Sequence, residues 1–432
     1  MVLTIGLGLM MGVVASTKPQ SATPLREAVE CRVREGLPNA LAKWRAGNEV
    51  RVAYLGGSIT EANGWRPKTM AWFASHFPNA KSVEINAAIG GTGSDLGVFR
   101  LKQDVLDHKP DLLFVEFAVN DSGAPEDRIR KGIEGIVRQT WHANPRTDIC
   151  FVYTLTEGML GDLVAGKCPR AAGVMEEVAD HYGIPSIHLG VEVARMHHDG
   201  KLLFTGPLPQ TDSERAALDG RIVFSGDGVH PYPETGHEIY LQCIQRGFAQ
   251  IEASPTKPFR HRMGSPLGMD NWERARLVPI SRSMLSSGWK HLDPGTDDIA
   301  KRFVARMPDL WQAGRPGETL TFRFKGTTAS IYDLLGPNCG QVSVQVDDGK
   351  PFTTPRFDAY CTYHRLAALP IAEGLPDRVH TVTIRILPDQ PDKLQILHQR
   401  RENASITSLD PKIYDGTNWY MGSIMVLGDV VG

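Results

Sequence analysis

The chain has 432 residues, of which 41% are hydrophobic and 22% are charged, values that are ordinary for a soluble globular protein. This length is enough for two domains, each with its own hydrophobic core. The formal net charge of −2 gives no basic excess that would attract a phosphate backbone, so the composition does not indicate nucleic-acid binding. After residue 15, no segment approaches the run of about 18 apolar residues that a membrane-spanning helix needs.

The first feature in chain order is an apolar N-terminal segment. Residues 1–15 are rich in Leu, Gly, Met and Val, and the polar run 16–20 follows them. This order is typical of a secretory signal, with Val13-Val14-Ala15 as a small-residue cleavage zone. Basic residues ahead of the apolar stretch are missing, and the alternatives are a buried N-terminal segment or a misassigned start codon. We expect residues 1–22 to be signal-like, the mature protein to be secreted or periplasmic, and no stable membrane span after removal of the segment.

The next part of the chain alternates apolar runs with amphipathic stretches. Apolar side chains at helical spacing over residues 25–46 predict a first helix that stops at Gly47. The predicted strands are 51–55, 82–86, 111–118, 148–154 and 184–188, and the later predicted helices are 66–76, 95–107, 126–143, 170–182 and 234–251. Continuously apolar strands that alternate with helices indicate a parallel sheet covered by helices on both faces. Ligands in such folds bind beyond the carboxyl ends of the strands.

The character of the sequence changes after about residue 270. Runs at 320–324, 329–332, 342–347 and 380–386 alternate apolar with polar residues and are separated by Gly, Pro and Asp. Period-two alternation in several short strands predicts an antiparallel β-sandwich, for which a jelly-roll-like fold is the natural expectation. We therefore divide the chain into the signal-like segment 1–22, an α/β domain 23–253, a linker 254–269 and a β-sandwich 270–432.

Four short motifs carry the residues that point to chemistry. Ser58 lies in Gly56-Gly57-Ser58-Ile59, directly after the strand 51–55. Asn86-Ala87-Ala88-Ile89-Gly90-Gly91-Thr92-Gly93 follows the next strand, and Val119-Asn120-Asp121 follows the third. The last motif, Asp227-Gly228-Val229-His230-Pro231, comes after the polar segment 197–226, which we expect to line or cover the active site. A serine nucleophile needs an imidazole base and a carboxylate that fixes the imidazole tautomer, so Ser58, His230 and Asp227 are candidate catalytic residues.

The order and local sequences of these motifs resemble the SGNH, or GDSL-like, hydrolase superfamily over roughly residues 48–252. This chain differs from the usual pattern in two places. It has Gly56-Gly57-Ser58-Ile59 where the family name implies Gly-Asp-Ser-Leu, and Ala118-Val119-Asn120-Asp121 where Gly-x-Asn-Asp is usual. The resemblance implies a three-layer α/β/α, flavodoxin-like fold with a parallel sheet.

The resemblance also implies a role for each motif residue. Ser58 would be the nucleophile, His230 the base and Asp227 the carboxylate that orients it. The oxyanion hole would consist of the N–H groups of Ser58 and Gly91 and the side-chain amide of Asn120, with Gly90 and Gly93 as competitors of Gly91. No metal ion or organic cofactor is implied.

Each of these residues also has a purely structural alternative. Ser58 could cap a helix, Asp227 could form an Asx turn, and Asp121 is expected only to support its neighbours through hydrogen bonds. The run His197-His198-Asp199 could bind a metal, although a solvated loop is the simpler interpretation. Aromatic residues of the second domain could stack on sugar rings or pack its core; they are Trp311, Tyr360, Tyr363, Trp419 and Tyr420. Among six cysteines, Cys339 and Cys361 are the expected disulfide pair.

Taken together, these patterns predict a serine esterase that hydrolyses small acyl esters, foremost O-acetyl esters, on carbohydrates through an acyl-enzyme intermediate. The carbohydrate assignment rests on the expected export and on the similarity of the appended sandwich to sugar-associated modules. One alternative is a lipase, thioesterase or acyltransferase of the same superfamily. Another is a non-catalytic glycan-binding protein in which only the sandwich functions. The sequence does not reveal an oligomeric state.

Overall fold

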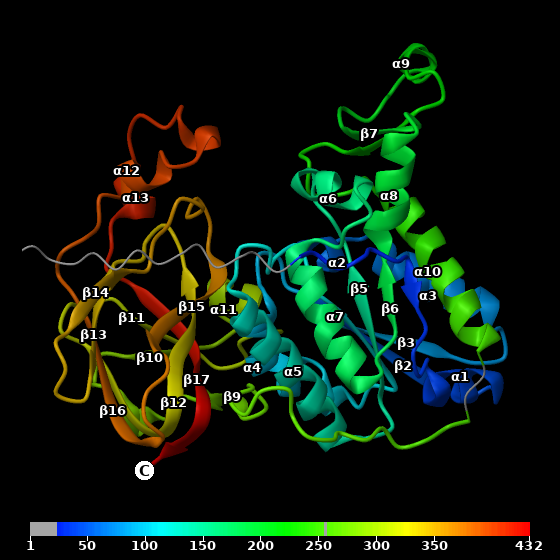
Figure 1. Cartoon of the computed structure of the whole chain (residues 1–432). Coiled ribbons are helices and arrows are strands. Elements are labelled where there is room, and N and C mark those ends of the chain that lie inside the picture. The colour runs from blue at the N-terminus through cyan, green and yellow to red at the C-terminus, as the bar shows by residue number, and fades with distance from the viewer. Residues whose placement is uncertain (1–23, 255–256) are drawn as a thin grey trace, which may run out of the picture.

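The N-terminal domain is built around a six-stranded sheet in the order β1-β6-β5-β4-β2-β3 (Figure 1). The structure, a computed structural model, describes residues 24–254 and 257–432. The strands of this sheet are β1 (Cys31–Arg32), β2 (Val50–Gly56), β3 (Ser82–Asn86), β4 (Leu112–Glu116), β5 (Asp148–Tyr153) and β6 (Ser186–His188). The last five pair in parallel, and β1 adds an antiparallel edge. Because β2 lies between β3 and β4, the five parallel strands have the flavodoxin-like order.

Helices cover both faces of this sheet, because alternate side chains of each strand point to opposite sides. Leu113 and Val115 of β4 face one core, whereas Leu112 and Phe114 face the other. The first core is covered by α4 (Ser94–Asp104), α5 (Glu126–Ala143) and α7 (Arg170–Tyr182). The second is covered by α1 (Pro38–Arg45), α3 (Trp65–His76), α6 (Leu160–Val164), α8 (Leu189–His198) and α10 (Gly236–Ala253). The predicted three-layer α/β/α class is confirmed.

The predicted helix over residues 25–46 is wrong in its first half. Residues Cys31–Arg32 instead pair with Ile187 and Ser186 at the edge of the sheet. The helix begins only at Pro38, a residue that fits the first helical position because its missing N–H would have no partner there. Just before it, the chain turns through Arg34 and Gly36, whose φ angles are +42° and +67°.

The segment 197–226 is more ordered than the sequence indicates. It contains β7 (Leu202–Thr205), α9 (Asp212–Ala217) and β8 (Ile222–Ser225), and β7 pairs in parallel with β8. Figure 1 shows α9 at the tip of an arm that points away from the second domain. The chain leaves this arm at the end of β8 and continues into the Asp227–His230 loop. The cavity beside Ser58 is lined by none of its residues, so the expectation that this segment lines the active site is wrong for that cavity.

The second domain is an antiparallel β-sheet folded into two layers. Its strands are β9 (Ala275–Pro279), β10 (Lys290–Leu292), β11 (Leu310–Ala313), β12 (Thr319–Leu335), β13 (Gln341–Val346), β14 (Phe352–Pro355), β15 (Arg365–Ala372), β16 (Arg378–Ile386) and β17 (Trp419–Val431). The long strands β12 and β17 pair with each other, and each changes its outer neighbour half-way along. Apolar side chains fill the space between the layers, so the predicted antiparallel sandwich is confirmed.

Two of the strands predicted for this domain form one continuous strand in the structure. The runs 320–324 and 329–332 both belong to β12, because a bulge near Gly326 bends the strand without ending it. Short helical elements complete the structure: α2 (Ser58–Glu61), α11 (Asp298–Phe303), α12 (Lys393–Leu397), α13 (Pro411–Tyr414), and the 3-10 turns η1 (Leu106–His108), η2 (Glu157–Met159), η3 (Arg282–Met284) and η4 (Arg401–Asn403).

The two domains share one hydrophobic core. Side chains of α4 and α5 pack in the same cluster as Phe303, Met307 and Tyr420 of the second domain. The described part of the predicted linker is also attached to the first domain: His261 stacks on Trp141 with ring centres 4.8 Å apart. The domains are therefore packed together and not merely tethered.

The predicted disulfide between Cys339 and Cys361 is wrong. All six cysteines are free and buried. The sulfur of Cys339 points toward the carbonyl of Leu334, whereas that of Cys361 lies within its own turn, 3.3 Å from Asp358 Oδ1. The two side chains also pack in different hydrophobic clusters. Each sulfur is thus held by its own surroundings.

The described helices include none that is both long and apolar enough to cross a membrane. The predicted signal-like segment 1–22 lies outside the described residues.

Candidate active site

Ser58 stands at the sharp turn where β2 becomes a helix. β2 ends at Gly56, Gly57 forms the N-cap, and Ser58 is the first residue of α2. The N–H groups in the first turn of a helix have no acceptor within the helix, so the N–H of Ser58 is available to a ligand. The turn thereby presents a hydroxyl and an N–H at the carboxyl end of the sheet.

Ser58, His230 and Asp227 form a continuous hydrogen-bonded chain. The distance from Ser58 Oγ to His230 Nε2 is 2.8 Å, and from His230 Nδ1 to Asp227 Oδ2 it is 2.7 Å. The second oxygen of Asp227 accepts from the N–H groups of Val229 and His230. Partial burial alone would raise the pKa of Asp227, but the His230 ring and these N–H donors hold it well below its usual range. Asp227 therefore stays ionised and orients the imidazole.

The loop that carries both residues is fixed by Ser225 at the end of β8. The hydroxyl of Ser225 accepts from the N–H groups of Asp227 and Gly228 and donates to Asp227 Oδ1 at 3.0 Å. Gly228 has a φ of +78°, which favours glycine, and its carbonyl accepts from the N–H of Glu157 at 2.9 Å. This tight turn holds the Asp227 carboxylate at hydrogen-bonding distance from the His230 imidazole.

The glycine-rich loop 87–93 lies beside Ser58. The N–H of Gly90 donates to Glu61 Oε2 at 2.8 Å, so it is already engaged. Gly93 is the N-cap of α4 and does not line the cavity. Gly91 has a φ of +71°, lines the same cavity as Ser58 and His230, and has no backbone or side-chain acceptor for its N–H among the described residues. Of the three glycines, Gly91 is the best placed to donate to a bound oxyanion.

Asn120 lies against Gly57. A Cβ atom added to Gly57 would stand 1.9 Å from Asn120 Oδ1, far inside contact distance. The absence of a side chain at position 57 therefore makes room for the Asn120 amide beside the nucleophile turn.

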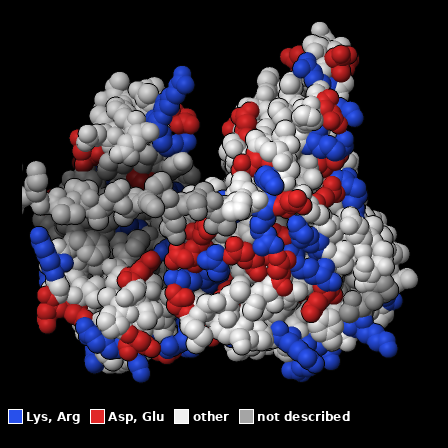
Figure 2. Space-filling view, viewed as in Figure 1, with Lys and Arg blue, Asp and Glu red and all other residues white. Residues whose placement is uncertain are grey.

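The cavity beside Ser58 has a volume of about 780 Å³ and is walled by both domains. Ser58, Gly91 and His230 form one side, and the other side consists of Arg302, Phe303, Tyr360, Tyr363, His364, Arg365 and Leu366. Figure 2 shows a deep notch between the part of the second domain that carries α12 and α13 and the arm of the first domain, with acidic and basic side chains interspersed on this face. A substrate at Ser58 would therefore meet side chains of both domains.

Comparison with known proteins identifies the first domain. Residues 54–238 match the GDSL-like lipase/acylhydrolase family. The N-terminal domain belongs to this family. No curated protein matches the sequence.

The fold of the GDSL-like domain together with the sandwich recurs in solved structures. A two-domain esterase (CEX) active on acetylated mannans, co-crystallised with mannopentaose, aligns over 92% of this chain and 97% of its own with a TM-score of 0.69 and 19% identity. A second structure of that esterase aligns over 89% and 93%, with a TM-score of 0.67 and 19% identity. Axe2, an acetylxylan esterase from Geobacillus stearothermophilus, covers 46% of this chain and 93% of its own at 17% identity and a TM-score of 0.34. The first two likenesses show that the two-domain architecture is shared.

Two acidic residues of the GDSL-like domain were missed by the sequence analysis. Glu116 is buried behind the nucleophile turn, where its carboxylate accepts from the hydroxyls of Thr60 at 2.8 Å and Thr154 at 2.7 Å. Burial raises the pKa of Glu116 despite these hydrogen bonds. Glu61 holds the Gly90 N–H. The sequence feature that could have revealed Glu116 is a carboxylate at the end of an otherwise apolar strand.

Asp121 has the supporting role expected for it. It is buried and accepts from the N–H of Ser94 at 3.0 Å, which ties the turn after β4 to the start of α4. Burial raises the pKa of Asp121 to about 7. The carboxylate does not reach the cavity lining.

The aromatic candidates of the second domain divide into two groups. Trp419 and Tyr420 are buried, and Trp311 is partly buried against His291. Tyr360 and Tyr363 are 48% and 52% exposed and line the cavity beside Ser58. Only these two of the five line the cavity, and the Arg400 guanidinium lies over the Tyr360 ring, 4.1 Å from its centre.

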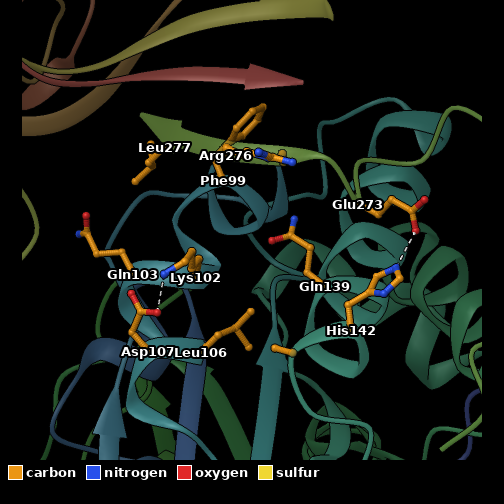
Figure 3. A pocket seen from close by; sticks show the side chains of 12 residues that line it. Phe99, Lys102, Gln103, Leu106, Asp107, Gln139, His142, Glu273, Arg276 and Leu277 are labelled. Carbon is orange, nitrogen blue, oxygen red and sulfur yellow. Dashed lines mark hydrogen bonds and ion pairs between the residues drawn. The ribbon is translucent and has the colours of Figure 1, made fainter. Parts of the chain in front are cut away.

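A second cavity of about 780 Å³ lies between α4, α5 and β9 (Figure 3). Its charged side chains have partners: Lys102 bonds to Asp107 at 2.6 Å, Glu273 lies 3.6 Å from His142, and Arg276 pairs with Asp429, outside the lining, at 2.8 Å. None of the candidate catalytic residues lines it. In the described ranges, no group of three or more His, Cys, Asp or Glu side chains is arranged to hold a metal ion, and this includes the run 197–199.

Two buried histidines of the GDSL-like domain make its stability sensitive to acid. His188 accepts from the Gly190 N–H at 3.3 Å and His237 from the Trp65 N–H at 3.0 Å, and burial lowers the pKa of each to about 4. The unfolded chain binds these protons near pH 6.5 and the folded chain only near pH 4, so stability falls as the pH drops through this window. The expected cost is about 3 kcal/mol per histidine. Urea unfolding between pH 7 and pH 4.5 measures it.

The variant His237→Gln takes up no proton, and it should therefore flatten the slope of unfolding free energy against pH by up to about 1.4 kcal/mol per pH unit. Identical slopes for the wild type and the variant would show that His237 does not titrate in this way.

Proposed function

We propose that the protein is a serine esterase that removes small acyl groups, foremost O-acetyl groups, from carbohydrates. The observation that carries this proposal is the Ser58–His230–Asp227 chain at the mouth of a cavity that both domains line. The fold relative described above, a two-domain esterase, is active on acetylated mannans, which supports the same substrate class for this chain.

In the acylation step, His230 Nε2 takes the proton of Ser58 Oγ as this oxygen forms a bond to the ester carbonyl carbon. The carbonyl oxygen becomes negatively charged and is stabilised by the N–H groups of Ser58 and Gly91 and by the Asn120 amide. The bond to the sugar oxygen then breaks, and His230 donates its proton to the leaving hydroxyl. Asp227 stabilises the imidazolium throughout.

In the deacylation step, a water molecule loses its proton to His230 Nε2 and attacks the acyl-enzyme carbonyl carbon. The same donors stabilise the second oxyanion. The bond from the acyl carbon to Ser58 Oγ breaks, the serine recovers its proton from His230, and the free acid departs.

The cavity lining suits an ester of a polar alcohol. Glu61, Arg302, His364 and Arg365 place charged or polar groups beside the nucleophile, where the hydroxyl groups of a sugar would find hydrogen-bonding partners. The exposed tyrosines of the lining add aromatic surface against which a sugar ring could pack.

The test is acetate release from acetylated mannan, xylan and pectin oligosaccharides, with Ser58→Ala as the control. We expect acetate from at least one of these substrates and none with the variant. Cleavage of long-chain acyl esters alone would refute the carbohydrate assignment, and glycan binding without any turnover would leave the protein a binding module.

Tyr360 and Tyr363 are expected to contribute to sugar binding but not to the chemistry. Replacing both with alanine should raise KM for an acetylated oligosaccharide about 30-fold, because each of the two stacking contacts is worth about 1 kcal/mol. The kinetics with nitrophenyl acetate should stay unchanged. Phe352→Ala, which removes a similarly exposed aromatic ring that does not line the cavity, is the control. Equal effects on both substrates would contradict a role in sugar binding.

A further inference from the structure

The loop 87–93, which carries Gly91, is held from the second domain as well as from the first. Arg306 lies in the turn between α11 and β11 of the second domain. Its Nη2 atom donates to the carbonyl oxygens of Asn86 at 2.8 Å and Ala88 at 3.3 Å. These carbonyls lie where β3 ends and the loop begins. One side chain of the sandwich domain thus bridges the base of the glycine loop.

Arg306 is itself held firmly. Its N–H donates to the carbonyl of Phe303 at 2.8 Å, and its own carbonyl accepts from Gln103 Nε2 at 3.0 Å. Its Nη1 atom lies 3.6 Å from Asp104 Oδ2. Phe303 and Met307, on either side in the chain, are buried in the core shared by the domains. The guanidinium therefore reaches the loop from a fixed position.

A second arginine also donates a hydrogen bond to this stretch of backbone. Arg100 of α4 is fully buried, bonds to the carbonyl of Ala87, and pairs with Asp104 Oδ2 at 2.9 Å. The carbonyls of three consecutive residues, 86–88, therefore accept from two guanidinium groups that share the carboxylate of Asp104.

The following peptide groups are held by the first domain. The N–H of Ile89 donates to the carbonyl of Gly56 at 3.0 Å, and the N–H of Gly90 donates to Glu61. The first N–H after this held stretch that lies free at the cavity is that of Gly91. The direction of the Gly91 N–H depends on the peptide groups before it. Arg306 is the residue through which the second domain hydrogen-bonds to those peptide groups.

We propose that Arg306 is a positioning residue for the oxyanion hole, so that the sandwich domain completes the catalytic geometry in addition to walling the cavity. This inference rests on the proposed esterase function. It implies that the second domain affects hydrolysis even of an ester that carries no sugar. Loss of one oxyanion donor costs about 100- to 1,000-fold in turnover, and a loosened donor should cost somewhat less.

The test compares Arg306→Ala and Arg306→Lys with wild type on nitrophenyl acetate, a substrate without a sugar. The number of active sites is titrated with a fluorophosphonate, so that kcat refers to folded, reactive Ser58 only. We expect kcat to fall about 10- to 100-fold for Arg306→Ala with KM within about twofold of wild type. Arg306→Lys should lie between, because an ammonium keeps the charge and can donate to a carbonyl but has no second nitrogen to stay beside Asp104.

Arg128→Ala is the matched control. Arg128 also joins the domains, through Glu373 and the ring of Trp272; it bonds to Asp95 of α4 at 3.2 Å, and no hydrogen bond joins it to the loop 87–93. Its kcat should stay within about twofold of wild type, even if thermal stability falls.

Several outcomes would overturn the proposal. One is a wild-type kcat per titrated site in both Arg306 variants; another is an equal loss in Arg128→Ala, which would indicate general loosening of the domains. If Arg306→Ala does not fold, Arg306→Lys decides by the same criterion. A wild-type protein that hydrolyses no ester would refute the proposed function itself, whereas normal turnover by the Arg306 variants refutes only this inference.

Discussion

Replacing Ser58 with alanine is expected to lower kcat for a small ester by about 10⁵-fold or more, because no other oxygen occupies the position from which acylation starts. His230→Ala should cost about as much, since an unassisted serine hydroxyl is a weak nucleophile at neutral pH. The structure places the two side chains 2.8 Å apart, at hydrogen-bonding distance. Initial rates with nitrophenyl acetate, normalised to folded protein, measure both effects.

The double variant sharpens this prediction. When two residues act as one catalytic unit, removal of either one abolishes the contribution of both. Ser58→Ala combined with His230→Ala should therefore be no slower than either single variant. Asp227→Asn should cost up to about 10⁴-fold, because the imidazole would lose the carboxylate that fixes its tautomer. Losses that multiply in the double variant would show that the two side chains act separately.

Replacing Gly57 with alanine is expected to lower kcat by about 100- to 1,000-fold, as much as removal of an oxyanion donor. The added methyl group would overlap Asn120 Oδ1 and force the amide out of place. Asn120→Ala should show a loss of the same size. KM should change little in both, because the lost contact forms fully only when charge develops on the oxygen.

The combination of Gly57→Ala with Asn120→Ala tests the mechanism behind this loss. If the methyl group acts by displacing the amide, the double variant should be about as active as either single variant. Gly161→Ala in α6 is the control, since a Cβ there meets nothing within 4 Å. Multiplying losses would mean that Gly57 matters for the backbone of the turn and not for Asn120.

The arrangement of the first domain could be predicted because its strands are buried on both faces. Such strands appear as continuous apolar runs, and β2, β4 and β5 lie where these runs do. Residues 25–37 were wrongly predicted to be helical because the spacing of their apolar side chains is a local pattern. The pairing of β1 with β6 depends instead on the remote residues Ser186 and Ile187. Tertiary pairing outweighed the local preference.

The candidate site was predictable only in part, for a related reason. Ser58, Asp227 and His230 lie in short motifs with recognisable neighbours, and the structure brings them together. Arg306 has no such motif. It acts on backbone carbonyls of Asn86 and Ala88, more than 200 residues away, and any residue type at those positions would offer the same oxygen. Contacts of this kind become visible only when the domains are seen packed together.

The central claim is that Ser58 is a nucleophile activated by His230, and covalent labelling tests it most directly. The protein is treated with a serine-directed fluorophosphonate, and the modified residue is located by peptide mapping while esterase activity is followed. We predict one label per chain, on Ser58, with activity lost in proportion and with no labelling of His230→Ala on the same timescale. An active esterase that remains unlabelled at Ser58 would contradict the account.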